Sequence, residues 1–308
     1  MNVTTSIQRL DPSAKSPALT IFSAPKPFKG HAGIIQENAI SSWSHLHPRP
    51  KIILFSNDTD TTDVGRRLDV DIVRPVETNT YGTPLVSSMF ALANSLAAGD
   101  VLAFVNADII LTQSTVDAAR IARQWSGRFL MVAQRHDVDV RTRVAFDEGW
   151  ERKWAADALA RGKLHSPGAI DWFVYPPGQY DDMPPFAIGR TAYDNWLLWK
   201  TIAMGVPLID ATAFATLIHQ NHDYSHSKLD TWHGPETQAN RKWIQHWTHY
   251  YTIAHANWTL TPDAQIRPAT GWKYRTAGAR QLVGHVLRAS RPIRNRIRTW
   301  RFARRYGV

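Results

Sequence analysis

A short apolar segment that ends in two oxygen-bearing side chains constrains the fold of this chain most strongly. Residues 101–105 are Val-Leu-Ala-Phe-Val, and Asn106 and Asp108 follow with one residue between them. So short an apolar run, with polar residues directly after it, predicts a buried strand. In extended backbone, residues two apart point to the same side, so we expect Asn106 and Asp108 to face one ligand. A polar turn that closes the strand is the alternative, because Asn and Asp are also common turn residues.

Strand-like and helix-like segments alternate through the first 140 residues. The expected strands are 18–23, 51–55, 71–73, 101–105 and 129–133. Apolar residues at helical spacing begin at Ile35, and Thr83 and Pro84 carry the signals of an N-cap and a first helical residue. A third helix is expected over 113–125. Such alternation is typical of an α/β fold with a mostly parallel central sheet flanked by helices.

The pattern changes after residue 140, where strands and helices no longer alternate regularly. The expected elements are a helix over 146–161, an apolar strand over 170–175, a helix over 192–204 with Thr191 as its N-cap, and strands over 207–209 and 214–218. In open α/β sheets, ligands bind outside the carboxyl ends of the strands. The polar residues at the ends of the first, second and fourth strands are therefore the first candidates for a site.

The composition excludes several kinds of site. No cysteine occurs among the 308 residues, which rules out disulfides, thiolate metal sites and a cysteine nucleophile. The length suits one large domain or two small ones. The first residues resemble no secretory signal, and no run approaches the length of a membrane span, so we expect a cytoplasmic protein.

The positive charge belongs to the C-terminal end of the chain. Eleven arginines and Lys273 follow Asp263, with no acidic residue among them, so this segment carries a charge of +12. Because the net charge of the chain is +10, residues 1–263 carry about −2. Ile293, Ile297 and Trp300 fall on one helical face with arginines on another, which is typical of a basic amphipathic helix on an anionic membrane surface. Nucleic-acid binding or simple disorder of this segment are the alternatives.

Signature motifs of several enzyme classes are absent. The sequence holds no G-x-G-x-x-G, no G-x-x-x-x-G-K-[ST], no H-E-x-x-H and no G-x-S-x-G. Dinucleotide oxidoreductases, P-loop ATPases, zincins and ordinary serine hydrolases therefore lose their usual signatures. An acidic strand end in an α/β sheet without a glycine fingerprint leaves nucleotide-sugar chemistry as the leading option.

An ordered set of short motifs carries a resemblance to a known family. Asn57-Asp58 follows the second strand, Asn79-x-x-Gly82 precedes a helix, and Asn106-Ala107-Asp108 ends the central strand. Over roughly residues 18–225 this order resembles GT-A glycosyltransferases, particularly family-2-like ones. In that family a D-x-D or related motif holds a divalent cation and the donor diphosphate. Asn106 replaces the first aspartate here, which lowers the local negative charge and leaves metal dependence open.

The resemblance implies a donor site and a metal site. The implied donor-binding residues are Ser23, Ala24, Pro25, Lys26, Asn57, Asp58, Gly82 and Asn106. The implied metal ligands, for Mn²⁺ or Mg²⁺, are Asp108 and His222, the latter from the histidine-rich segment after the strand over 214–218. The bland alternatives are that Asn57-Asp58 is an ordinary turn and that Lys26 is simply solvated.

The resemblance also implies an acceptor site around the helix over 192–204. Asp194 is the expected base for an acceptor hydroxyl if the reaction inverts the anomeric centre, with Asp171 as the runner-up. A carboxylate in the first turn of a helix is also stabilised by the helix dipole, which by itself explains Asp194 equally well. Arg190, Trp196 and His219 are the expected acceptor-binding residues.

The sequence therefore predicts a glycosyltransferase that moves a sugar from a nucleotide-sugar donor to a glycan or lipid-linked glycan, in the synthesis of a cell-envelope polysaccharide or lipopolysaccharide. We expect an N-terminal extension (1–17), a catalytic domain (18–262) with a donor half (18–140) and an acceptor half (141–262), and a basic tail (263–308) on the inner face of the membrane. No nucleic-acid partner is expected. A nucleotidyltransferase, or a non-catalytic carbohydrate- or nucleic-acid-binding protein, remains the alternative.

Deletion of residues 275–308 should abolish binding to vesicles that contain anionic lipid, because each cation near such a surface contributes about 1 kcal/mol. Vesicle co-sedimentation of the full and shortened chains measures this effect, with neutral phosphatidylcholine vesicles as the control. Equal binding of both chains to anionic vesicles would contradict the membrane role of the tail.

Overall fold

The computed structural model describes residues 19–59, 61–222, 234–244, 246 and 249–269. The chain divides into two units, 1–268 and 269–308. The expected N-terminal extension and the amphipathic helix of the tail lie outside the described residues. Within the described part, no helix combines the length and the apolar character that crossing a membrane requires.

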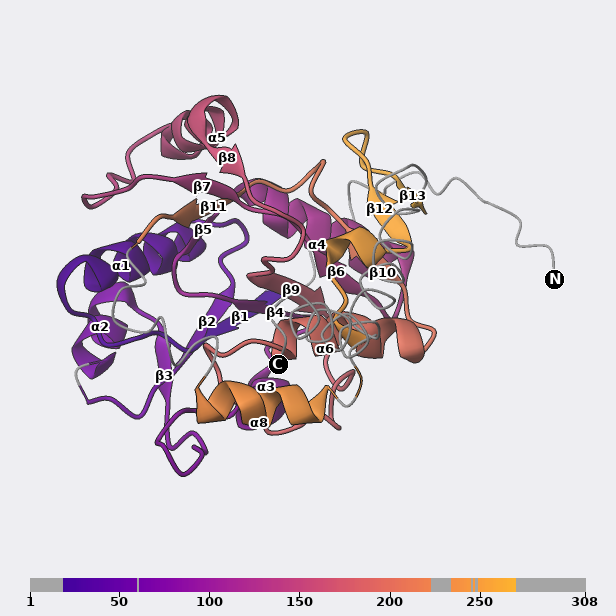
Figure 1. Cartoon of the computed structure of the whole chain (residues 1–308). Coiled ribbons are helices and arrows are strands. Elements are labelled where there is room, and N and C mark those ends of the chain that lie inside the picture. Colours follow the sequence, from indigo (N-terminus) through magenta and orange to yellow (C-terminus); the bar gives the residue numbers. More distant parts are fainter. Residues whose placement is uncertain (1–18, 60, 223–233, 245, 247–248, 270–308) are drawn as a thin grey trace, which may run out of the picture. The chain divides into compact units, whose positions relative to one another are not determined.

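The first unit is built on a large mixed sheet (Figure 1). In spatial order, its strands are β13 (Ile266–Pro268), β12 (Trp258–Leu260), β10 (Leu208–Asp210), β6 (Leu130–Val132), β9 (Trp172–Tyr175), β4 (Val101–Val105), β1 (Leu19–Ser23), β2 (Lys51–Phe55) and β3 (Asp71–Val73). Neighbouring strands run parallel, except that β9 is antiparallel to both β4 and β6, and β13 is antiparallel to β12. The α/β class with a mostly parallel central sheet, as expected from the sequence, is confirmed.

Helices cover both faces of this sheet (Figure 1). The helices are α1 (Gly30–Ser44), α2 (Thr61–Leu68), α3 (Val86–Leu96), α4 (Gln113–Trp125), α5 (Trp150–Arg161), α6 (Tyr193–Ala203) and α8 (Pro235–Trp243), with a 3₁₀ turn at Ile253–His255. All five residues of β1 and all five of β4 are buried. Near-continuous apolar strands of this kind are what a parallel sheet between two helical layers requires.

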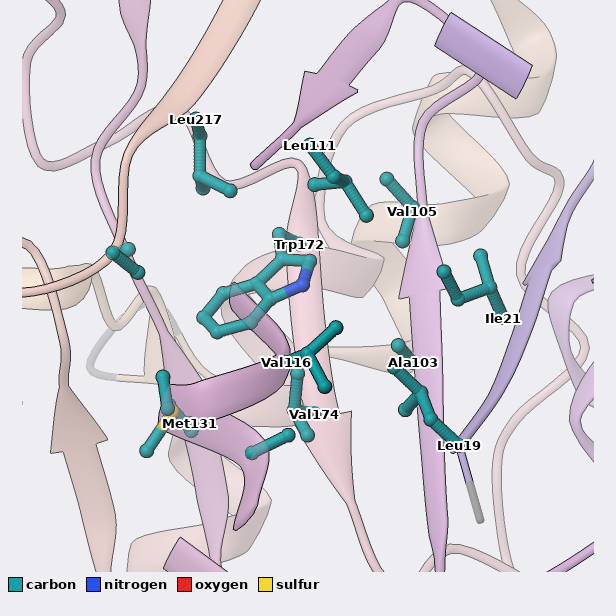
Figure 2. Packing of buried hydrophobic residues seen from close by; sticks show 14 of the residues in the cluster. Leu19, Ile21, Ala103, Val105, Leu111, Val116, Met131, Trp172, Val174 and Leu217 are labelled. Carbon is teal, nitrogen blue, oxygen red and sulfur yellow. The ribbon is translucent and has the colours of Figure 1, made fainter. Parts of the chain in front are cut away.

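The two faces of the sheet carry different cores, because successive strand residues point to opposite sides. The face under α1 and α4 is mainly aliphatic and includes Ile21, Ala39, Ala103, Val105, Val116 and Val174 (Figure 2). The other face is aromatic and includes Phe22, Phe90, Phe104, Phe173, Tyr175 and Tyr193, with ring centroids 5.2–6.1 Å apart in most contacting pairs. The aromatic face seats α3 and α6.

A second, four-stranded sheet was not expected from the sequence. Its order is β5 (Ile109–Leu111), β11 (Leu217–Gln220), β7 (His136–Val138) and β8 (Lys163–Leu164). It continues the chain directly beyond the carboxyl ends of two strands of the large sheet: β4 leads into β5, and β6 leads into β7. Its strands are only two to four residues long, too short to give a periodic signal in the sequence.

Trp172 of β9 joins the two sheets in one core. Its side chain is buried, and Figure 2 shows its ring among Leu111 of β5, Leu217 of β11 and Val116 of α4. The indole nitrogen of Trp43, on α1, donates a hydrogen bond to the carbonyl of Ile109 at 2.9 Å. Burying a large aromatic ring stabilises such a contact by roughly 2–3 kcal/mol, so the small sheet is held rigidly on the large one.

Two expected helix starts are wrong. Helix α3 begins at Val86 rather than after Thr83. Leu85 forms an antiparallel β-bridge with Ala187 instead of joining the helix. In this bridge Val86 N–H donates to the Phe186 carbonyl, and Ile188 N–H donates to the Pro84 carbonyl. Helix α6 has Ala192 as its N-cap, at φ 104°, and begins at Tyr193, so Thr191 does not cap it.

The expected division of the chain also differs from the structure. Strands β9 and β10 from the expected acceptor half lie beside β4 and β6 from the donor half, so the two halves share one sheet. Residues 263–268, expected in the tail, form a turn and strand β13 of the same sheet. The strand expected over 214–218 is β11, displaced to 217–220, and the helix expected from 146 begins at Trp150.

Candidate functional site

The carboxyl ends of the central strands meet at one edge of the large sheet. Strand β1 pairs in parallel with both β2 and β4, which brings the residues after all three strands together. Because β9 is antiparallel to β4, its amino end lies at the same edge, and Asn106 N–H donates to the Asp171 carbonyl at 3.0 Å. The site expected at this edge therefore also receives Asp171.

The segment Asn106-Ala107-Asp108 is a turn and not an extension of β4. Ile109 N–H donates to the Asn106 carbonyl at 3.1 Å, and β5 begins directly afterwards. The expectation that Asn106 and Asp108 point to the same side is therefore wrong. The Asn106 amide nitrogen donates to the Asp171 carboxylate at 2.5 Å, whereas the Asp108 carboxylate contacts His222.

Asp108, His219 and His222 form a compact group of ligand-type atoms. A hydrogen bond of 3.1 Å joins His222 Nε2 and Asp108 Oδ2, and His219 Nε2 lies 3.7 Å from the same oxygen. One nitrogen from each histidine and one carboxylate oxygen lie within 4.8 Å of one another. Asp108 comes from the turn between the sheets, and both histidines come from the end of β11.

Several buried polar atoms of this group lack a hydrogen bond. Among the described residues, Asp108 Oδ1 and both ring nitrogens of His219 have no hydrogen-bond partner. His219 Nδ1 lies 3.0 Å from Asp137 Oδ1, but this contact does not have hydrogen-bond geometry. Buried polar atoms without partners are costly, and a cation bound to the Asp108 carboxylate and to one nitrogen of His219 would satisfy these two ligand atoms. The residues present therefore fit a divalent metal ion.

The electrostatics of the group also suit a cation. Burial would raise the pKa of the Asp108 carboxyl, but the hydrogen bond to His222 and the charges of His219, His222 and Arg135 outweigh it and hold the pKa well below its usual range. Burial lowers the pKa of His219, so its ring is neutral at neutral pH. An ionised carboxylate and a neutral imidazole are the states in which these side chains bind metals.

The structure thus brings Asp108 and His222, the two expected metal ligands, together. It adds His219, for which an acceptor-binding role was expected. His219 is 3% exposed and faces Asp108, so its position suits a metal ligand better than a group that meets an acceptor. Two imidazoles and one carboxylate favour Mn²⁺ over Mg²⁺, because Mg²⁺ prefers oxygen ligands.

Asp194 lies in the first turn of α6, near the same group. Its Oδ1 atom is buried and has no hydrogen-bond partner among the described residues. Burial, together with the charge of Asp171, raises its pKa to about 6, although backbone amides of the first turn oppose the rise. Burial raises the pKa of the Tyr193 hydroxyl well above its usual value, and the charges of Asp194, Asp171 and Asp108 raise it further.

Asp171, the expected alternative base, is held by two partners. Its Oδ1 atom accepts the hydrogen bond from Asn106, and its Oδ2 atom forms an ion pair with Arg135. Both side chains of that ion pair are only 9% exposed. Both oxygens of Asp171 are thus engaged by protein donors, whereas Asp194 Oδ1 has no hydrogen-bond partner among the described residues, so Asp194 is the better placed of the two to accept a proton.

The other expected acceptor-binding residues contact the protein itself. Arg190 forms an ion pair of 2.5 Å with Glu236 of α8. Trp196 is buried, and its ring packs 5.8 Å from Phe186. Arg190 therefore helps to hold α8, and Trp196 contributes to the core beneath α6.

The expected donor residues at the end of β1 lie at the carboxyl edge. The Ser23 hydroxyl is buried without a hydrogen-bond partner among the described residues, and Lys26 is exposed. Gln36 of α1 holds the loop: Lys26 N–H donates to its side-chain oxygen at 2.6 Å, and its amide donates back to the Lys26 carbonyl at 3.0 Å. Ala24 and Pro25, between them, are partly exposed.

The remaining donor candidates form turns. Asn57 binds the backbone of Val76 through both ends of its amide, at 2.9 Å each, which ties the end of β2 to the loop after β3. Asp58 N–H donates to the Ser56 hydroxyl at 3.1 Å. Gly82 has φ +80° in an exposed turn, where a side chain would be strained. Turn formation by itself thus explains why asparagine stands at position 57 and glycine at position 82.

Sequence reasoning missed three residues beside the metal group. The Asp137 carboxylate accepts hydrogen bonds from Arg135 Nε at 3.1 Å and forms one with His165 Nδ1 at 2.5 Å. Asp137 and His219 are paired residues on neighbouring strands β7 and β11. The signal was present, because the polar segment Gln134–Asp137 follows β6 as Asn106 follows β4.

No protein-family model and no curated protein matches the chain. Among solved structures, the chain is similar to the mannosyltransferase PcManGT from Pyrobaculum calidifontis in complex with GDP-Man and Mn²⁺ (TM-score 0.44, 13% identity, covering 73% of this chain and 63% of that one). It is also similar to glucosyl-3-phosphoglycerate synthase from Mycobacterium tuberculosis with phosphoglyceric acid (TM-score 0.42, 15% identity, 73% and 78%) and to S. aureus TarS 1–349 with UDP-GlcNAc (0.41, 14%, 68% and 60%).

The chain spans less than two thirds of the mannosyltransferase and of TarS 1–349. All three TM-scores are below 0.5.

Replacing Asp108 with Asn should weaken Mn²⁺ binding by at least about 100-fold without unfolding the protein, because it removes the only anionic ligand of the group. Isothermal titration with Mn²⁺ and with Mg²⁺, together with thermal melting, measures this. Asp63→Asn, at an exposed position on α2, is the matched control. Unchanged Mn²⁺ affinity in Asp108→Asn, or tighter binding of Mg²⁺ than of Mn²⁺ by the wild type, would contradict the assignment.

Proposed function

We propose that this protein is a metal-dependent glycosyltransferase that moves a sugar from a nucleotide-sugar donor to an acceptor hydroxyl. The observation that carries the proposal is the Asp108, His219 and His222 group at the carboxyl edge of the sheet, in which Asp108 Oδ1 and the His219 ring nitrogens have no hydrogen-bond partner among the described residues. The charges of Asp108 and of Asp194 both act on the Tyr193 hydroxyl. A cation-binding group and a proton acceptor are the two components that such a transfer requires.

The metal group serves the donor. A bound divalent cation supplies positive charge to the diphosphate oxygens as the leaving group departs. Asp108, His219 and His222 hold the cation, and the exposed Lys26 at the end of β1 adds a second positive charge at this edge. The buried Ser23 hydroxyl, without a partner among the described residues, is available to the nucleotide.

Asp194 serves the acceptor. As the acceptor oxygen forms its bond to the anomeric carbon, the bond from that carbon to the diphosphate oxygen breaks, and the hydroxyl proton passes to the Asp194 carboxylate. Burial and Asp171 raise the pKa of Asp194 to about 6, so it is largely ionised at neutral pH and a better proton acceptor than an ordinary aspartate. A single displacement of this kind inverts the anomeric centre, and Asp194 is the base that we propose for that outcome.

The acceptor class follows from the basic C-terminal segment. Residues 264–308 carry eleven arginines, one lysine and no acidic residue. This composition supports association with the anionic inner face of a membrane, where lipid-linked glycans are assembled. We therefore propose an envelope polysaccharide or lipopolysaccharide precursor as the acceptor.

The principal rivals make different predictions about donor chemistry. A nucleotidyltransferase would be expected to carry a glycine-rich basic loop after its first strand, and Ala24-Pro25-Lys26-Pro27 holds no glycine. A non-catalytic binding protein would bind carbohydrate or nucleic acid without turnover. A panel of UDP-, GDP-, CMP- and dTDP-sugars, assayed for hydrolysis and transfer with and without Mn²⁺, separates these rivals. Release of pyrophosphate when a nucleoside triphosphate and a sugar 1-phosphate replace the nucleotide sugar favours the first, and the absence of both turnover and nucleotide binding favours the second.

The rate of transfer should rise with pH through about 6 and then level off, because the base acts only when it is ionised. Asp194→Asn should lower kcat by roughly 10²–10⁴-fold and remove this dependence. Asp182→Asn is the matched control, since Asp182 is an exposed carboxylate that pairs with Lys200 of α6, the helix that also carries Asp194. A wild-type rate in Asp194→Asn would refute the assignment of the base.

A further inference from the structure

Behind the metal group lies a continuous chain of polar side chains. The Asn106 amide donates to Asp171 at 2.5 Å, Asp171 forms an ion pair with Arg135, and Arg135 Nε donates to Asp137 at 3.1 Å. The chain ends at His219, whose Nδ1 atom lies 3.0 Å from Asp137. It therefore runs from the turn that carries Asp108 to a ligand on a different strand of the small sheet.

The two ring nitrogens of His219 have different neighbours. Its Nε2 atom lies 3.7 Å from Asp108, on the side of the metal group, and its Nδ1 atom lies on the side of Asp137. Histidines that bind metals usually direct their second nitrogen to a carboxylate or carbonyl, which fixes the orientation of the ring. Asp137 is the carboxylate on that side here, at 3.0 Å without hydrogen-bond geometry, and it is itself held by Arg135 and His165.

The same chain explains why asparagine stands at position 106. The Asp171 oxygen that accepts from Asn106 is only 2.5 Å away, and the other oxygen is taken by Arg135. An aspartate at 106 would place two carboxylates in contact in a buried setting, where both cannot remain ionised without a further cation. The amide instead donates the hydrogen bond that Asp171 requires.

We propose that Asn106, Asp171, Arg135 and Asp137 form one positioning network that orients His219 toward the metal, and that position 106 serves this network rather than the metal itself. The proposal rests on the metal site of the proposed function. These four are positioning residues, because they act through His219 and do not themselves reach the cation.

The test compares Mn²⁺ affinity, measured by titration with the metal alone, in variants of the network. Asp137→Asn should weaken Mn²⁺ binding by about 10–100-fold, the usual effect of losing a group that orients a metal ligand. The visible absorption spectrum of bound Co²⁺ should change as well, because the ligand geometry changes. Unaltered Mn²⁺ affinity in Asp137→Asn would overturn the proposal.

The pair at 106 and 171 provides a rescue experiment. Asn106→Asp should lower the melting temperature and weaken Mn²⁺ binding, whereas the double variant Asn106→Asp/Asp171→Asn restores one donor and one acceptor and should recover a large part of both. Asn94→Asp is the matched control, because Asn94 donates to Asp181 at 3.1 Å in an exposed pair of the same kind. Tighter Mn²⁺ binding in Asn106→Asp, or no recovery in the double variant, would overturn the proposal.

These measurements separate the network from the function. If the wild type binds Mn²⁺ and the network variants weaken that binding, but no nucleotide sugar turns over, the function alone fails. If sugar transfer is observed while Asp137→Asn binds Mn²⁺ as the wild type does, the network alone fails. If the wild type does not bind Mn²⁺, the metal site and the network fail together.

Discussion

The site depends on the antiparallel placement of β9 between β4 and β6. This placement buries Trp172 against the aliphatic core and against Leu111 and Leu217 of the small sheet, so the two sheets cannot move independently. It also carries Asp171, the residue before Trp172, to the edge where the parallel strands end. The packing of Trp172 in the core therefore also fixes the position of the neighbouring Asp171 carboxylate. Strand β11 is tied to the turn after β4 through β5, since Ile109 pairs with His219 and Gln220 N–H donates to the Asp108 carbonyl at 3.3 Å.

Among the described residues, the buried Arg135 supplies positive charge to two carboxylates at this edge. Asp171 and Asp137 share Arg135, and the pKa of Asp137 is lowered because the hydrogen bond from His165 and the charges of Arg135, His219 and His165 outweigh burial. Asp194 has no such partner, and burial raises its pKa instead. The pKa of Asp137 is thus lowered and that of Asp194 raised by their different surroundings. In this way one carboxylate of a site can stay ionised while another accepts a proton.

Much of the large sheet was predictable because its strands are continuous apolar runs with polar ends. Asp108 and His222 could be proposed together from the strand-end rule and the family resemblance. The small sheet could not be predicted, since nothing local indicates that β11, which overlaps the strand expected over 214–218, pairs with β5 and β7. The roles of Asn106 and Asp108 diverge because the chain turns at 106–108, which is the alternative that the turn preference of Asn and Asp had left open.

By itself, the sequence determined the α/β class and the chemical types available at the strand ends, because hydrophobic patterning and side-chain chemistry are local properties. Only the tertiary structure decided which of those side chains meet. Asp137 and His219 are 82 residues apart and become neighbours through strand pairing, and Arg135 joins Asp171 only because β9 runs antiparallel beside β6. Such contacts arise from the register of distant strands, which packing of the whole core selects and no local pattern encodes.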